Sequence, residues 1–132
     1  MKIKKGSCLC GAVKYRVKLD KLPLVYNCHC IDCRKKTGGA FVTVIQLRDQ
    51  ALDINKDNLA SFKHPGYSKK NLHKFCCKIC ASPIYSYVEK FEKIFLYAGS
   101  LEEINDIISS KNINFESSHF PFITIENSGN KI

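Results

Sequence analysis

The chain has 132 residues, of which 45% are hydrophobic and 25% are charged, and its formal net charge is +9. This composition excludes a disordered polypeptide, and the length fits a single domain spanning residues 1–132. No apolar run approaches the roughly 18 to 20 residues that a membrane-spanning helix needs. The chain starts with MKIKKGSCLC, which is basic but has no apolar stretch behind it, so we expect a cytoplasmic protein rather than a secreted one.

The excess of positive charge has two interpretations. Lys and Arg number 21 against 12 Asp and Glu, which fits either a solvated, lysine-rich surface or attraction for an anionic partner. That partner would be a nucleic acid or a small anionic substrate. The basic residues form no long tract, and the chain has no RNA-binding aromatic motif. Nucleic acid is therefore the less favoured partner.

Hydrophobic periodicity predicts a chain made mainly of strands. Residues 13–19 alternate apolar with basic side chains, which is typical of a strand with one wet face. Further strands are expected at 24–27, 41–47, 61–63, 72–75, 84–88, 94–98 and 120–126. Helical signals are limited to a turn at 31–37 and a short helix before Asn105, opened by a capping box of Ser100 and Glu103. The pattern predicts a mainly β, antiparallel domain.

Seven of the eight cysteines fall into three tight clusters that lie at predicted strand ends and turns. They are Cys8 and Cys10, then Cys28, Cys30 and Cys33, and finally Cys77 and Cys80, with Cys76 directly before the last pair. Disulfides and metal binding both explain such a count, and a reducing cytoplasm favours free thiols and zinc. Thiolate is a preferred zinc ligand, and short spacings let several sulfurs reach one ion.

The first and last clusters each supply two sulfurs. Together, Cys8, Cys10, Cys77 and Cys80 would complete a tetrahedral structural zinc site that joins the first strand to a later one. Because such a site closes a long loop, zinc binding there would contribute directly to folding. The alternative is two independent sets of buried thiols, but paired short spacings favour the shared site.

The central cluster, Cys28, Cys30 and Cys33, has only three sulfurs. Three thiolates leave a coordination position open for a thiol, a water or an aldehyde oxygen, as in catalytic zinc sites. His29 lies between two of the cysteines, so we expect its side chain to point away, as a surface group or as a support for the ligands.

The residues that follow the central cluster are candidates for substrate binding. Arg34, Lys35 and Lys36 are either an ordinary solvated run or a means of attracting an anionic substrate. Next come Thr37, Gly38 and Gly39, whose glycines either let backbone N–H groups approach a ligand or simply make a turn.

Three segments, GSCLCGAVKY, CHCIDCRKKTGGAF and CCKICASPIY, resemble the signatures of the glutathione-dependent formaldehyde-activating family, which includes the centromere protein V domain. The resemblance runs from about Gly6 to Ser100. It implies a small β-tent fold with two zinc ions, a structural one on Cys8, Cys10, Cys77 and Cys80 and a catalytic one on Cys28, Cys30 and Cys33. The implied activity is that of a carbon–sulfur lyase, which joins glutathione and formaldehyde into S-hydroxymethylglutathione. The basic residues after the central cluster would suit the anionic glutathione. Arg34, Lys35, Thr37, Gly38 and Gly39 are therefore the predicted substrate-binding residues.

The chain departs from the family pattern near its last cluster and at its end. Cys76 stands where the family has Phe, and we interpret it as a small buried side chain, with an alternative role as a ligand. Ala81 stands where the family has Gly, so a positive φ there would strain it. The final segment matches poorly, and His119 is the best candidate for the family's histidine.

These observations lead to two hypotheses. The first is a zinc-dependent, carbon–sulfur lyase-like enzyme that acts on a thiol, glutathione, and an aldehyde. The second is a non-catalytic zinc module that binds a protein or a nucleic acid. A methionine sulfoxide reductase is disfavoured, because it needs two C-x2-C pairs and a separate reactive cysteine.

Overall fold

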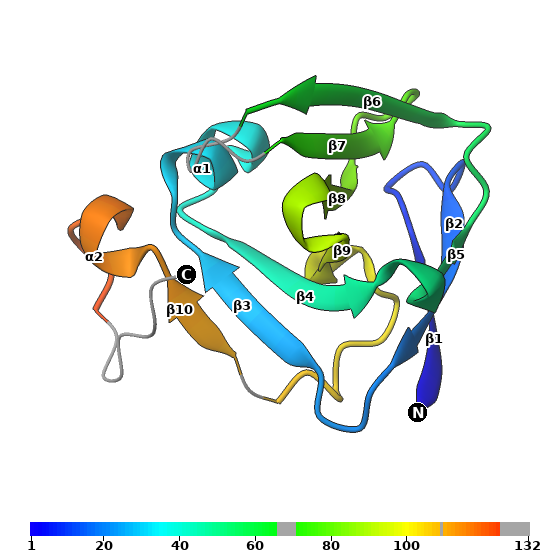
Figure 1. Cartoon of the computed structure of the whole chain (residues 1–132), viewed down its shortest axis with the longest axis horizontal. Coiled ribbons are helices and arrows are strands. Elements are labelled where there is room, and N and C mark those ends of the chain that lie inside the picture. Colours follow the sequence, from blue (N-terminus) through cyan, green and yellow to red (C-terminus); the bar gives the residue numbers. More distant parts are fainter. Residues whose placement is uncertain (66–70, 109, 125–132) are drawn as a thin grey trace.

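The structure is a computed structural model that describes residues 1–65, 71–108 and 110–124, and these residues form two sheets (Figure 1). The smaller sheet has the strand order β1 (Lys2–Ser7), β2 (Lys14–Leu19), β5 (Leu52–Ile54). The larger has the order β10 (Lys111–Ile113), β3 (Leu24–Cys28), β4 (Val42–Arg48), β9 (Lys93–Tyr97), β8 (Pro83–Val88), β7 (Leu72–Cys77), β6 (Leu59–His64). Two short helices, α1 (Ile31–Thr37) and α2 (Phe115–Ser118), follow β3 and β10. The mainly β, antiparallel β-tent fold predicted from the sequence is confirmed.

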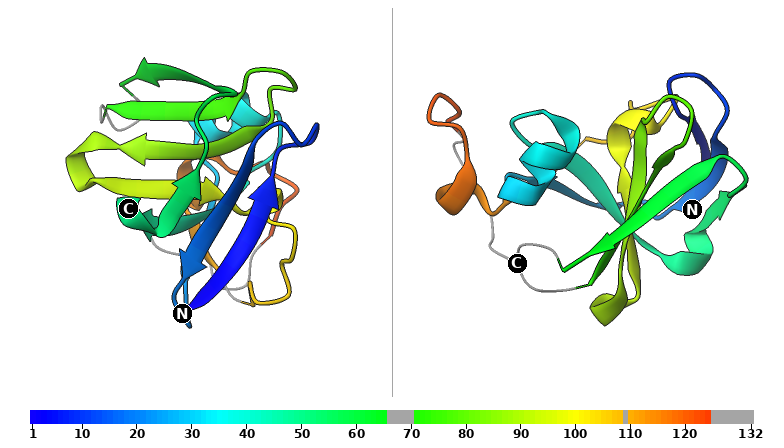
Figure 2. Two further views of the ribbon diagram at one scale, coloured as in Figure 1. Left: turned by 90° about the vertical axis from the view of Figure 1, so that its right-hand side faces the viewer. Right: turned by 90° about the horizontal axis from the view of Figure 1, so that it is seen from above.

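The main hydrophobic core lies between the two sheets, whose strands cross obliquely (Figure 2). Strand β2 supplies Tyr15, Val17 and Leu19 to this core, while the basic residues between them face solvent. Ile45 of β4 and Leu96 of β9 are completely buried opposite them. The alternation read from the sequence thus sets which face of β2 packs against the larger sheet.

The larger sheet is antiparallel except at one edge, where β10 runs parallel to β3. It curls strongly, so that β3 and β4 come to face β6 and β7 across a concave surface (Figure 1). Side chains alternate between the two faces of each strand, so residues that do not enter the main core point into this concave surface. The functional candidates are found there.

The segment after β9 is fastened to the first strand. Gly6 forms a β-bridge with Leu101, and Lys2 and Lys4 both make ion pairs with Asp106. These contacts hold residues 101–106 along β1 without a regular helix. The helix predicted after Ser100 is therefore wrong, because Ser100 instead ends a 3₁₀ turn at Ala98–Ser100 and donates its hydroxyl hydrogen to the Tyr97 carbonyl.

Two other expectations concern the C-terminal part. The strand predicted at 120–126 is wrong over its described part, because residues 120–124 form a turn and irregular structure, while 125 and 126 lie outside the described residues. Three strands were not predicted, β1, β5 and β10, two of them only three residues long. No helix in the described part of the chain has the length and hydrophobicity needed to cross a membrane.

Candidate metal centres and the pocket beside them

The first and last cysteine pairs meet at one point, as the sequence predicts. Cys8 and Cys10 follow β1, whereas Cys77 ends β7 and Cys80 lies in the turn before β8. The four sulfur atoms all lie within 4.8 Å of one another. Because β1 and β7 belong to different sheets, a metal ion held by these sulfurs would tie the two sheets together.

The turns around this four-cysteine cluster are shaped by left-handed backbone conformations. Gly11 has φ +83° and Ala81 has φ 64°, each just after a cysteine pair. These turns aim backbone N–H groups at sulfur, such as Val13 N–H at Cys8 Sγ (3.2 Å). Backbone donors of this kind stabilise thiolate, which is the form that binds metal. Ala81 thus does have the positive φ that would strain a residue other than glycine.

The thiols of this cluster differ in acidity. The Ser82 hydroxyl, 3.1 Å from Cys80 Sγ, lowers the pKa of the Cys80 thiol to about 5. For Cys10 a hydrogen bond from the Ala12 backbone favours the thiolate, but burial and the neighbouring sulfurs outweigh it and raise the pKa to about 11. Metal binding here therefore has to displace protons from part of the cluster.

The central cysteines form a second cluster, whose three sulfurs also lie within 4.8 Å of one another. Cys28 ends β3, Cys30 is the N-cap residue of α1, and Cys33 lies in the first turn of that helix. Cys30 Sγ accepts a hydrogen bond from the Cys33 N–H (3.4 Å). The neighbouring thiols of Cys28 and Cys33 lower the pKa of Cys30 to about 2, so this cluster holds at least one thiolate.

Strand β10 supports the three-cysteine cluster from the side. Asn114 lies just after the strand with φ 54° and points its side-chain amide at Cys28 Sγ (3.6 Å). Asn112 Oδ1 lies 3.1 Å from His29 Nε2. Residues more than 80 positions away in the chain thus hold both the sulfur and the adjacent histidine in place. The sequence did not predict this, because a three-residue strand has too little pattern to be recognised.

His29 is fully buried, with 0% of its surface exposed. Its ring lies 4.9 Å from that of Phe41 and 5.0 Å from that of Phe115, measured between centroids. It is not one of the metal-type donors that cluster with the three cysteines. The prediction that His29 supports the ligands fits this position, whereas the alternative of a surface group is wrong.

A pocket of about 250 Å³ opens beside the three-cysteine cluster, on the concave face of the larger sheet. Cys28, Cys30 and Cys33 form its polar end, together with Asp32 and Asn114. Its other walls are apolar side chains from five strands of the sheet, among them Ile113 of β10, together with Phe91. A metal ion on three thiolates would therefore face a pocket that is open to solvent on one side, which suits an ion that has to meet a substrate.

Lys74 is a functional candidate that the sequence reasoning missed. It lines this pocket from β7 and is only 4% exposed, yet no hydrogen bond or ion pair of its ammonium group occurs among the described residues. A lysine side chain is seldom this buried, so Lys74 is singled out as a candidate group of the pocket. The sequence did contain an indication of this position, because Leu72 and Lys74 are two residues apart and therefore lie on the same face of strand β7.

Two further polar groups of the pocket, Ser86 and Tyr97, lie on strands β8 and β9, which the sequence predicted. Ser86 of β8 is the antiparallel register partner of Lys74, and its hydroxyl lies 3.4 Å from the Tyr97 hydroxyl. Burial raises the pKa of Tyr97 to about 12, so this phenol stays neutral and can donate a hydrogen bond. On the α1 side, Asp32 Oδ2 is buried and has no hydrogen-bond partner among the described residues.

The residues predicted to bind substrate take other positions. Arg34 lies over the ring of Phe120 (5.5 Å to its centroid), and Lys35 is exposed on α1. Thr37 and Gly38 end the helix, where Gly38 has φ +76° and donates its N–H to the Arg34 carbonyl.

None of the five predicted residues, Arg34, Lys35, Thr37, Gly38 and Gly39, lines the pocket beside the three cysteines. Thr37 lines a separate hollow of 490 Å³, and its hydroxyl accepts a hydrogen bond from the Gly39 N–H. Their binding of substrate remains a prediction, and their observed contacts are those of a helix C-cap and its surroundings.

The remaining two side chains singled out in the sequence lie away from the clusters. Cys76 is half-buried in β7 opposite Ala60, and its sulfur belongs to neither cysteine cluster. His119 stacks on Phe115 with 4.0 Å between ring centroids, and its Nδ1 lies 2.6 Å from the Phe115 carbonyl oxygen. Neither lines the pocket.

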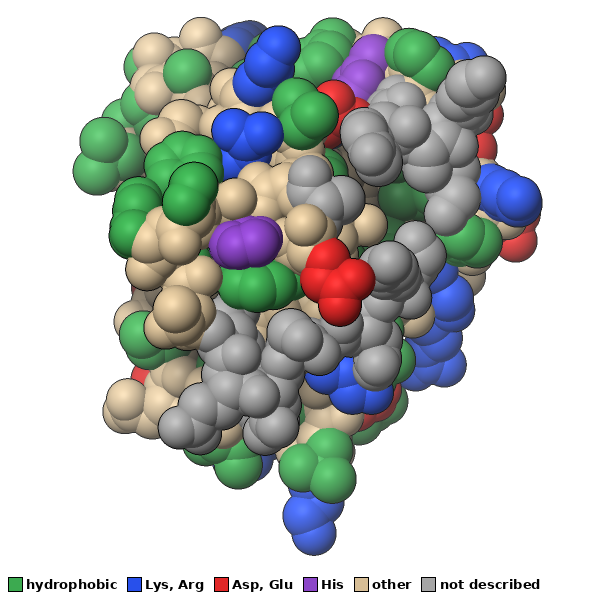
Figure 3. Space-filling view, turned by 90° about the vertical axis from the view of Figure 1, so that its left-hand side faces the viewer, with side chains coloured by type: hydrophobic (Ala, Val, Ile, Leu, Met, Phe, Trp, Pro, Cys, Tyr) green, Lys and Arg blue, Asp and Glu red, His purple; other side chains and the backbone are tan. Residues whose placement is uncertain are grey.

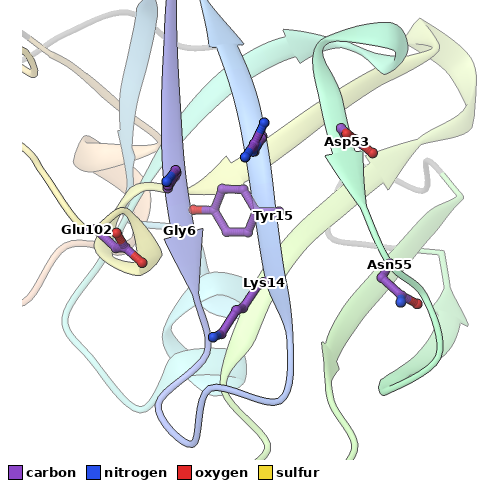
Figure 4. Close-up of a pocket in the computed structure, with 8 residues that line it drawn as sticks. Gly6, Lys14, Tyr15, Asp53, Asn55 and Glu102 are labelled. Atoms are coloured by element: carbon purple, nitrogen blue, oxygen red, sulfur yellow. The ribbon is translucent and has the colours of Figure 1, made fainter.

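A hollow of 350 Å³ on the smaller sheet is of a different kind. Charged side chains surround it, including Lys14, Asp53 and Glu102, and no cysteine lines it (Figure 4). The Tyr15 ring crosses from β2 towards Gly6 of β1, and its hydroxyl lies 2.6 Å from Ser100 Oγ. These features fit packing between strands better than catalysis.

The thiol arrangement fits zinc. In a regular tetrahedron with zinc–sulfur bonds of about 2.3 Å, the sulfurs are about 3.8 Å apart. The separations of 3.6 Å between Cys8 and Cys10 Sγ and 3.8 Å between Cys10 and Cys77 Sγ agree with this value. The four-cysteine cluster can therefore enclose one ion, and the three-cysteine cluster can hold another with one position open to the pocket.

The family model of the glutathione-dependent formaldehyde-activating enzyme matches residues 3–117. The chain belongs to this family. A crystal structure of a Rhodobacter sphaeroides protein, a structural genomics target, superposes with a TM-score of 0.65 at 20% identity. The superposition covers 82% of this chain and 98% of that one, which supports the shared fold. No curated protein matches the chain at a significant level.

Proposed function

We propose that the protein is a zinc-dependent enzyme that forms and cleaves a carbon–sulfur bond between a thiol and an aldehyde. The observation that supports this proposal most strongly is the pocket whose polar end is the three-cysteine cluster. Glutathione and formaldehyde are the reactants in the name of the family. In this proposal Cys8, Cys10, Cys77 and Cys80 hold a structural ion, and Cys28, Cys30 and Cys33 hold the reactive one.

The reaction adds a thiol across a carbonyl group. The carbon–sulfur bond forms, the carbonyl electron pair moves to oxygen, and the thiol proton ends on that oxygen. A zinc ion bound by the three thiolates would supply Lewis acidity and would favour the thiolate form of the substrate. The remaining tasks, which are orientation and control of the developing negative charge, belong to side chains of the pocket.

Lys74 is suited to the charge that develops on oxygen. Its side chain is buried, lines the same pocket as the three sulfurs and makes no hydrogen bond or ion pair among the described residues, so its ammonium can donate a hydrogen bond or a proton to the forming alkoxide. The hydroxyls of Ser86 on β8 and Tyr97 on β9 also line this pocket and can donate further hydrogen bonds. Asn114 holds Cys28 Sγ through its amide and so keeps that sulfur aimed at the pocket.

The alternative is a non-catalytic zinc module that binds a protein or a nucleic acid, and the net charge of +9 is the observation that favours it. On the face that bears α1 and α2, however, Lys and Arg side chains are dispersed among hydrophobic and histidine side chains (Figure 3). A nucleic-acid site is expected to gather its basic residues into one patch. This face therefore gives the alternative little support.

The test is exchange spectroscopy by NMR on glutathione, formaldehyde and their adduct, with zinc-loaded protein. The proposal predicts exchange faster than in buffer, and slower exchange again with the Cys30→Ser variant. Because the reactants also combine without a catalyst, the uncatalysed rate is subtracted at each concentration. An exchange rate equal to that of buffer, with both ions bound, would contradict the assignment.

A further inference from the structure

The walls of the pocket beside the three cysteines differ sharply from its polar end. Six apolar side chains of the sheet line them: Val42, Val44, Leu72, Val88, Phe95 and Ile113. Phe91 adds a ring that is 42% exposed and lies where the pocket meets solvent. The pocket thus has one end suited to a reacting polar group and a wall suited to an apolar substituent.

The size of the pocket bears on what can fill it. At about 30 Å³ per water molecule, its 250 Å³ corresponds to about eight waters. Formaldehyde has no substituent and would leave nearly all of the apolar wall without a contact. Glutathione has charged ends and peptide groups, which an apolar wall cannot solvate. Neither reactant therefore accounts for the apolar lining.

The strand register shows that this lining is a continuous surface rather than scattered residues. Leu72 of β7 is the register partner of Val88 of β8, and Ser86 of β8 is the partner of Phe95 of β9. The polar pair Lys74 and Ser86 lies two residues further along the same two strands, and therefore on the same face. A substrate oxygen near Lys74 would therefore place its substituent against Leu72, Val88 and Phe95.

We propose that the carbonyl substrate carries an apolar group, as in a medium-chain aliphatic or an aromatic aldehyde, which fills this pocket while the aldehyde oxygen lies near Lys74. The inference rests on the proposed thiol–aldehyde reaction and specifies its carbonyl partner. The thiol then enters through the open side of the pocket, beside the Phe91 ring, which is 42% exposed.

Aldehydes of increasing length test this inference. With zinc-loaded protein and glutathione, the ratio of catalysed to uncatalysed adduct formation is measured for formaldehyde, propanal, butanal, hexanal and benzaldehyde. Each buried methylene should raise the ratio by about fourfold until the pocket is full. A ratio that is flat with length, or highest for formaldehyde, would overturn the inference while leaving the proposed function intact.

A variant pair ties the effect to the pocket. Phe95→Ala should lower the ratio for benzaldehyde about tenfold and the ratio for formaldehyde much less, since only the larger aldehyde contacts the ring. The matched control is Phe62→Ala on β6, which lies outside this pocket and should change neither ratio. Equal losses in the two variants would contradict the assignment of the wall.

The binding of alcohols, which cannot react with the thiol, distinguishes an error in the proposed substrate class from an error in the proposed reaction. Hexanol, benzyl alcohol and methanol are titrated into zinc-loaded protein, and the NMR shifts of pocket residues are followed. Hexanol and benzyl alcohol should bind more tightly than methanol and shift Val44, Val88 and Phe95. If no aldehyde is converted but these alcohols bind, the proposed reaction fails and the ligand class stands. If methanol binds equally well, the ligand class is wrong.

Discussion

Lys74 and Ser86 are paired across β7 and β8 on the face of the sheet that lines the pocket beside the three cysteines. Leu72, Val88 and Phe95 line the pocket beside them, and no hydrogen bond or ion pair of the Lys74 ammonium occurs among the described residues. A positive charge kept beside an apolar pocket wall indicates that a negative charge forms or binds in the pocket. We assign it to the oxygen of the carbonyl substrate.

Replacement of this lysine should separate activity from stability. Lys74→Met keeps the length of the side chain and removes the charge, so we expect the rate of adduct formation to fall about 100-fold, the loss typical of removing one donor to a developing oxyanion. The melting temperature should stay equal or rise, because an apolar side chain replaces a charged one that has no ion pair among the described residues, at a position that is only 4% exposed. Exchange NMR and calorimetry measure the two effects.

The control for this substitution is Lys18→Met, an exposed residue of β2 in the smaller sheet. It should change neither rate nor melting temperature. A Lys74→Met protein with a lower melting temperature and unchanged activity would show that the lysine has a packing role only.

Gly6 should tolerate no side chain. A Cβ there would lie 2.1 Å from Cζ of the buried Tyr15 ring, whose hydroxyl is held by Ser100. Gly6→Ala should therefore destabilise the protein by about 1–3 kcal/mol, as for other overpacked sites, when measured by urea unfolding of the zinc-loaded form. Gly99→Ala is the matched control, since a Cβ there meets nothing within 4 Å. Equal effects of the two substitutions would contradict this account of the close approach.

Ala81 should be stabilised by glycine. Its φ of 64° costs a non-glycine residue about 1–2 kcal/mol, and the greater flexibility of glycine in the unfolded chain offsets about half of that. Ala81→Gly should therefore raise the free energy of unfolding by about 0.5–1 kcal/mol. Ala60→Gly, in strand β6 with no positive φ, should lower it. If both substitutions destabilise equally, the turn is not strained at Ala81.

The sequence predicted those parts of the molecule that depend on local pattern. Strands β2, β4, β8 and β9 were expected from alternation and β-branched residues, and the helix at Ile31–Thr37 from its surroundings. The grouping of Cys8 and Cys10 with Cys77 and Cys80 followed from metal-ligand spacing alone. Sequence pattern is sufficient where the structure of a segment depends on residues close to it in the sequence or on its role as a metal ligand.

The remaining features depend on contacts between distant segments. Strand β10 is three residues long and is fixed by β3, so Asn112 and Asn114 could not be connected with His29 and Cys28 in advance. The Ser100 hydroxyl was read as a helix cap, but tertiary packing directs it to Tyr97 and Tyr15 instead. Lys74 was overlooked because a lysine is normally exposed, and only the curl of the sheet buries it.

Zinc stoichiometry by elemental analysis tests the division of roles between the cysteine clusters most directly. The account predicts two zinc ions per chain in the wild-type protein. Cys30→Ser should retain one ion and stay folded, because the four-cysteine site that joins the two sheets is intact. Cys80→Ser should lose cooperative folding, because that site is broken. One ion in the wild-type protein under saturating zinc, or equal loss of metal and folding in the two variants, would contradict the account.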